Sequence, residues 1–69
     1  MTAEARPLAG SLELAASPAA TDEQLRELAR DDSLEVRQGV ASNPSTPAEV
    51  LMELAFDPSA RVRGTLGIE

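Results

Sequence analysis

The chain has 69 residues, with twelve carboxylates against six arginines and a net charge of −6 at neutral pH. A chain of this size forms at most one small domain, and no cysteine is present to reinforce it with a disulfide. The acidic balance argues against direct nucleic-acid binding, and the absence of histidine and cysteine removes the usual zinc and iron–sulfur ligands, so we expect no cofactor.

The N-terminal segment is the least regular part of the sequence. Residues 1–7 include Glu4 and Pro7 and no long apolar stretch, so we expect a flexible arm and no secretory signal. Residues 8–14 are apolar enough for a helix, but Gly10 and Ser11 stand where the repeats described next carry valine and arginine. We interpret residues 8–14 as a degenerate capping helix.

Residues 15–40 (the first copy) and 41–66 (the second copy) carry one pattern twice. Aligned without a gap, the two copies are identical at 11 of 26 positions. Self-similarity at a fixed period is typical of stacked repeat proteins, in which each unit buries its apolar face against its neighbours.

The first helix of each copy is expected to begin at a threonine, Thr21 or Thr46, with Pro47 following the second of these. A hydroxyl there suits the free N–H groups of a helix start, and proline suits the first turn. Leucine and alanine spaced i, i+3 and i+4 then form one apolar stripe. Its members are Leu25, Leu28 and Ala29 in the first copy and Leu51, Leu54 and Ala55 in the second.

A second, shorter helix is predicted to follow in each copy. Residues 31–33 and 57–59 separate it from the first helix, because their short polar side chains and a proline interrupt helical structure. The second helix carries an apolar pair one turn apart, which is Val36 and Val40 or Val62 and Leu66. Asn43 then leads into a turn, since a residue before proline is pushed out of the helical region.

The stretch "ASNPSTPAEVLMELAFDPSARVRGTL" resembles the leucine-rich repeat variant family, a relative of the HEAT and armadillo repeats. The resemblance rests on the elements Asn-Pro-x-Thr-Pro, Leu-x-x-Leu-Ala-x-Asp and Val-Arg, and it spans about residues 15 to 66. It implies an α-helix paired with a short or 3₁₀ helix in each repeat, stacked into a right-handed solenoid. The first copy departs from the pattern, because Ser17 and Ala20-Thr21 replace Asn43 and Thr46-Pro47.

We therefore expect an all-α fold, a short right-handed α-solenoid of about two and a half two-helix repeats. Its single domain is predicted to span residues 8–69, after the arm at 1–7. Within the domain we expect the cap at 8–14, repeats at 15–40 and 41–66, and a tail at 67–69.

This number of repeats is small, because about three are commonly needed for a stable stack. At the C-terminal edge we expect Val62, Leu66 and Ile68 to be partly uncovered. We favour completion of the stack by further copies of the chain or by a larger assembly. The alternative is a marginally stable chain with frayed ends.

The two copies differ most on the outer face of the first helix. Arg26 and Arg30 of the first copy are replaced by Met52 and Phe56 in the second, and Phe56 is the only phenylalanine in the chain. In the first copy we expect these arginines to pair with glutamates of the same helix. Met52 and Phe56 are instead typical of an interface, and a partner contact is predicted there. Val50 is expected to contribute, with Glu49 and Glu53 as a polar rim. The alternative is that the arm or the tail covers this patch.

Arg37 and Arg63 follow Asp31 and Asp57 by six residues at the loop between paired helices. They suggest either phosphate contacts or a structural tie between repeats. We favour the tie, in which each arginine reaches back to that aspartate or to loop carbonyls of a neighbouring unit.

Catalysis is not expected, because the chain lacks His, Cys, Lys, Tyr and Trp and therefore the usual nucleophiles and bases. We favour a small protein–protein interaction module. Two alternatives are an accessory subunit of a viral particle and an acidic mimic that occupies a nucleic-acid-binding protein. No run approaches the roughly 20 apolar residues of a membrane span, so we expect no membrane contact and a cytoplasmic location, or a virion if the chain is phage-encoded.

Overall fold

The computed structural model describes residues 8–67, and within that range the chain is all-helical, as predicted. The helices are α1 (Leu8–Ala16), α2 (Asp22–Leu28), α3 (Leu34–Ser42), α4 (Ala48–Leu54) and α5 (Ala60–Thr65). The arm expected at 1–7 and residues 68–69 of the expected tail lie outside the described residues.

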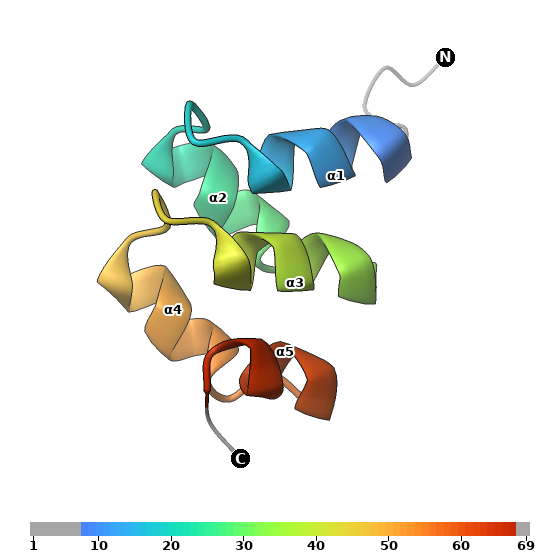
Figure 1. The fold of residues 1–69 in the computed structure, drawn as a ribbon, viewed down its shortest axis with the longest axis vertical. Helices are drawn as coiled ribbons and strands as arrows, with labels where there is room; N and C mark the ends of the chain where they lie inside the picture. The colour runs from blue at the N-terminus through green and yellow to red at the C-terminus, as the bar shows by residue number, and fades with distance from the viewer. Residues whose placement is uncertain (1–7, 68–69) are drawn as a thin grey trace.

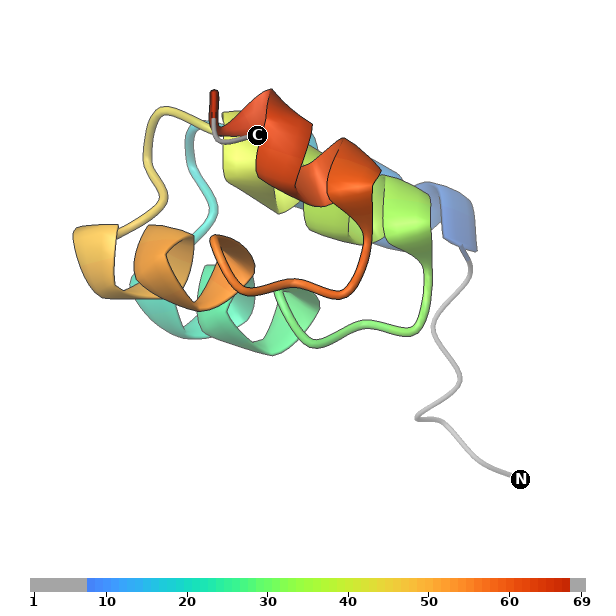
Figure 2. The ribbon, with the colours of Figure 1, turned by 90° about the horizontal axis from the view of Figure 1, so that it is seen from below.

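The helices form two layers. In Figures 1 and 2, α1, α3 and α5 lie side by side in one layer, while α2 and α4 form the other. Helix α3 is central, because it contacts each of the other helices. The handedness of the stack and the number of repeats remain predictions.

Side chains define most of the helix starts. The Thr21 hydroxyl accepts a hydrogen bond from the Gln24 backbone N–H, and the Gln24 side chain accepts from the Thr21 N–H. Ser33 and Ser59 cap α3 and α5. Thr46 does not cap α4. Its hydroxyl donates to the Val40 carbonyl at 2.7 Å, so it closes the end of α3 instead, and Pro47 stands at the N-cap without a side-chain hydrogen bond.

The helix lengths differ from those expected. The prediction of a shorter second helix is wrong for the first copy, because α3 has nine residues and α2 has seven. In the second copy α5 has six residues, one fewer than α4, and Gly67 ends it with a φ of 82°. The second helices are α-helical. Helix α1 continues to Ala16, two residues beyond the predicted cap.

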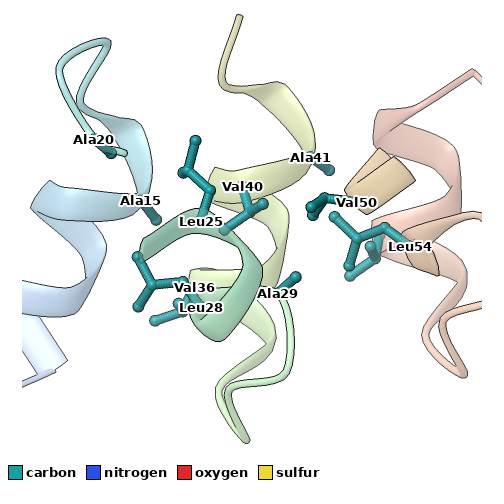
Figure 3. Close-up of a cluster of buried hydrophobic side chains, with 11 residues drawn as sticks. Ala15, Ala20, Leu25, Leu28, Ala29, Val36, Val40, Ala41, Val50 and Leu54 are labelled. Carbon is teal, nitrogen blue, oxygen red and sulfur yellow. The ribbon is translucent and has the colours of Figure 1, made fainter. Parts of the chain in front are cut away.

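The core lies between the two layers. Figure 3 shows Val36 and Val40 of α3 gathered with Leu25 and Leu28 of α2, and all four side chains are buried. The second copy buries a different set, because Val50 joins Leu54 in the core while Leu51 is only half-buried. Helix α4 is therefore turned so that the residue before Leu51 faces inward.

Gly39 allows α1 and α3 to approach closely. A Cβ atom at this position would lie 3.0 Å from the Cβ of Ala15, which is tighter than ordinary van der Waals contact. The pairing of glycine with alanine therefore fixes the spacing of these two helices. The equivalent of Gly39 in α5 is Thr65, which is exposed.

We expect alanine substitution to cost more stability at Leu25 than at Leu51, although the two leucines are equivalent in the repeat. Leu25→Ala removes a side chain that is 0% exposed, and such deletions typically cost about 2–5 kcal/mol. Leu51→Ala should cost less than about half of this, because the side chain is already partly in water. Thermal and urea unfolding of both variants would test the difference. Equal losses would contradict it.

Candidate functional site

Two ion pairs join the first helices of the two copies. The Arg26 guanidinium donates to the carboxylate of Glu49, and Arg30 donates to Glu53 at 2.8 Å. We call these two pairs the arginine ladder. They correct the expectation of pairing within α2, because both arginines reach forward to α4.

The ladder lies at the surface and changes the titration of one glutamate. The hydrogen bond from Arg30 holds the pKa of Glu53 below its ordinary value, and the charge of Arg30 acts in the same direction against partial desolvation. The same contact raises the pKa of Arg30. The carboxylate of Glu53 is thus stabilised in its charged form by the neighbouring helix.

A more buried ion pair joins α3 of the first copy to the loop between α4 and α5. The Arg37 Nε donates to Asp57 Oδ2 at 2.7 Å, and the two side chains are 16% and 5% exposed. The Nη1 of Arg37 also donates to the carbonyls of Asp31 and Asp32. A tie between the copies was expected, but with the opposite partners. Arg37 binds backbone carbonyls in the loop of its own copy and the aspartate in the loop of the second copy.

Asn43 supplies a second tie that sequence reasoning missed. Its buried side-chain amide donates to the carbonyls of Ala15 at 2.7 Å and Ser17 at 2.8 Å, while its oxygen accepts from the Ser45 N–H. One side chain therefore holds two successive turns together. The signal available was an asparagine before Pro44 at the start of a repeat, where an amide can donate and accept at once.

The predicted contact residues divide between the core and the surface. Met52 and Phe56 are exposed, at 67% and 85%, and no other large hydrophobic side chain among residues 10–67 is exposed. Val50 is 1% exposed, so its assignment to a surface contact is wrong. Glu49 and Glu53 border the patch, but the arginine ladder holds their carboxylates.

A line of exposed apolar residues runs along α4 and just past its C-terminal end. Ala48, Met52 and Phe56 follow one another at four-residue spacing, and all three are exposed. We call them the outer patch. The equivalent residues of the first copy are Asp22, Arg26 and Arg30, so every member of a charged line has been replaced by an apolar residue.

The side of the second copy that points away from the first copy is incompletely covered. Leu25, Ala29 and Val40 are buried in the first copy, whereas their equivalents in the second copy are half-buried. These equivalents are Leu51, Ala55 and Leu66. Together with the outer patch they form what we call the forward face, which adjoins α5 at the lower end of the molecule in Figure 1.

Two other residues expected at this edge are placed differently. Val62 is 0% exposed, so the prediction that it is partly uncovered is wrong; it packs in the core from α5. Ile68 lies outside the described residues.

Arg63 stands at the forward face in the position of Arg37. Like Arg37, it donates from Nη1 to the carbonyl of the loop aspartate of its own copy, Asp57. Arg37 also binds a carboxylate, that of Asp57, whereas none of the ion pairs found among residues 8–67 includes Arg63. Arg63 therefore makes the carbonyl contact that Arg37 makes, but not the contact to a carboxylate of the next copy.

The repeated loop contacts lie in a segment with a known sequence pattern. Residues 34–59 match the family model of the leucine rich repeat variant. The match runs from α3 through the Asn43 turn and α4 to the loop that holds Asp57, and it has the length of the 26-residue period. No curated protein and no solved structure matches the chain.

The described residues include neither a metal-binding cluster nor a helix that could span a membrane. In residues 8–67 no group of three or more acidic, histidine or cysteine side chains is placed to hold a metal ion. The helices of this part of the chain are too short and too polar to cross a membrane. An open depression on α2, lined by Thr21, Glu23, Gln24 and Glu27, is polar and lies away from the forward face.

Removing Asp57 should destabilise the chain far more than removing Asp31. Each aspartate accepts a hydrogen bond from the serine N–H two residues later, but only Asp57 receives an arginine from the other copy. Asp57→Ala leaves Arg37 with little exposure and no carboxylate, a change that typically costs about 3–5 kcal/mol. Asp31→Ala is the matched control for the lost cap. Similar melting temperatures for the two variants would contradict this assignment.

Acid should weaken the ladder in the range where Glu53 titrates. Because the folded pKa of Glu53 is lowered, the pair contributes stability above the ordinary glutamate pKa and loses it as the pH falls through the folded value. We expect the Glu53→Gln variant to lose less stability than the original chain over this acid range. Melting temperatures measured as a function of pH would test this, with Glu13→Gln on α1 as a control.

Proposed function

We propose that this protein is a small, non-catalytic protein–protein interaction module that binds its partner through the forward face. The match of residues 34–59 to a repeat family supports the general class, because such repeats generally serve as interaction modules. The observation that carries the proposal is the exposure of Met52 and Phe56 at the positions where the first copy has the arginines of the ladder. Clusters of exposed methionine and aromatic side chains are enriched at interfaces.

The residue types available support a module without catalysis. The chain has no histidine, cysteine, lysine, tyrosine or tryptophan, so an activated nucleophile or a neutral-pH base of the usual kinds is absent from its sequence. The polar depression on α2 offers only carboxylate, amide and hydroxyl groups. A binding role therefore fits the composition better than an enzymatic one.

The acidic-mimic alternative has less support. It requires a continuous line of free carboxylates, and the glutamates of α4 would form half of that line. Glu49 and Glu53 are both paired with arginines of α2, which neutralises that half at the surface. The charge pattern is therefore alternating, whereas a nucleic-acid mimic needs charge of one sign.

Substituting Phe56 by arginine should abolish association with a partner or with a second copy. Phe56→Arg restores the chemistry of Arg30 and leaves the core untouched, because Phe56 is exposed and lies just beyond Ala55, the C-cap of α4. We expect unchanged helix content by circular dichroism and the loss of any associated species in sedimentation.

The matched control is Ala16→Arg, which adds the same charge at an exposed position on α1, at the other end of the molecule. This variant should associate as the original chain does. Association that survives Phe56→Arg, or that is lost equally in both variants, would rule out the forward face as the contact site.

A further inference from the structure

We propose that the forward face binds a separate protein that presents a helical hairpin with two features: a carboxylate in the loop between its helices, and apolar side chains where this chain has Glu49 and Glu53. This proposal rests on the proposed function and specifies the chemistry of the partner. It follows from the way the first copy already contacts the second.

The contact between the two copies shows which residues of a neighbouring helix pair lie opposite which residues of the face that it covers. Seen from the first copy, its neighbour places Asp57 opposite Arg37 and places Glu49 and Glu53 opposite Arg26 and Arg30. The forward face keeps the equivalent of Arg37, which is Arg63, but replaces both ladder arginines with apolar residues. A hairpin held in the same register must therefore keep the loop carboxylate and replace the two glutamates.

Arg63 is oriented for such a carboxylate. Arg37 uses Nη1 to bind its own loop carbonyl and Nε to bind the aspartate of the next copy. Arg63 makes the first of these contacts with the Asp57 carbonyl, which fixes the guanidinium at the edge of the forward face. Because the side chain is only half exposed, the partner that covers it must supply an acceptor.

A second copy does not provide both features. Stacked head to tail, it would bring the equivalents of Glu49 and Glu53, which are Glu23 and Glu27, to Met52 and Phe56. Met52 and Phe56 offer no hydrogen-bond donor to these carboxylates, whereas Arg26 and Arg30 donate to Glu49 and Glu53, and burying a charge against apolar side chains is costly. The replacement of both ladder arginines therefore disfavours a head-to-tail stack.

A second copy that docks through its own forward face also fails. The outer patches would match each other, but each copy would bring Arg63, and among residues 8–67 the acidic side chains of α4 and its following loop already have arginine partners. Glu49 and Glu53 are held by the ladder, and Asp57 is held by Arg37. Charge complementarity thus favours an unlike protein over a second copy at this face.

Two peptides test this chemistry on the full chain. Both consist of residues 41–67 and carry Met52→Arg and Phe56→Arg, so that neither presents an outer patch of its own. One also carries Glu49→Leu and Glu53→Leu, and we call it the leucine peptide; the other keeps both glutamates and is the glutamate peptide. Their dissociation constants are measured by fluorescence anisotropy against the original chain and against a Met52→Arg/Phe56→Arg chain, which restores the ladder arginines.

We expect the original chain to bind the leucine peptide at least about tenfold more tightly than the glutamate peptide, and the restored chain to reverse this order. Binding of the glutamate peptide to the restored chain also shows that the peptides are competent, because that complex repeats the contacts between the two copies. No preference in the original chain, or a preference for the glutamate peptide, would overturn the proposal.

Arg63→Gln tests the carboxylate. We expect it to weaken binding of the leucine peptide to the original chain about fivefold or more, whereas Arg61→Gln, which removes an exposed charge two residues away, should have little effect. Equal effects would overturn the role of the loop carboxylate.

The failure of this proposal can be told apart from the failure of the proposed function. A dimer of the original chain that sedimentation detects and that Phe56→Arg abolishes would mean that a second copy occupies the forward face. That result overturns the unlike partner and leaves the interaction module standing. If the original chain binds neither peptide and Phe56→Arg leaves its association unchanged, both this proposal and the proposed function are overturned.

Discussion

The structure depends on the fact that none of its described helices is long enough to be stable alone. They contain six to nine residues, whereas an isolated helix in water is marginal even at about 12–15 residues. Each helix therefore exists because its apolar side is buried by the others, and α3, which touches all of them, is the element on which the rest depends. Loss of burial on α3 removes support from both layers at once.

Polar contacts then decide how the helices are spaced and oriented. Arg37 and Asn43 satisfy backbone carbonyls at turns and loops that the short helices leave uncapped, and each side chain also makes a contact that reaches a second copy or turn. Because these groups are buried or nearly so, a shift in register would leave donors or acceptors unpaired. The apolar core supplies the driving force, and these side chains select one arrangement from those it allows.

The sequence was sufficient for features that depend on local spacing. The helices, the Thr21 cap, the buried stripe at Leu25 and Leu28, and the exposure of Met52 and Phe56 all follow from residues within one or two turns of each other. Contacts between copies were predicted less well, because they depend on how far a long side chain reaches to the neighbouring helix. Arg26 and Arg30 had glutamates available in their own helix and use those of α4 instead.

The misplacement of Val50 and the partial exposure of Leu51 have one physical origin. Centring the apolar stripe on Leu51 placed Val50 at the surface, but Val50 is the residue that joins Leu54 in the buried cluster, near Ala41 of α3 in Figure 3. In α2 the equivalent position is Gln24, which is exposed. Equivalent positions of a repeat can therefore differ in burial, because the two copies have different neighbours. This difference becomes visible only when the helices are packed into layers.

The arginine ladder also gives the stack a direction. Both donors belong to the first copy and both acceptors to the second, so the two edges that meet at this contact are not interchangeable. Two helix pairs can join in this way only when arginines on one edge meet carboxylates on the other. The second copy has Met52 and Phe56 in place of the two arginines, so its outer edge cannot make the same contact.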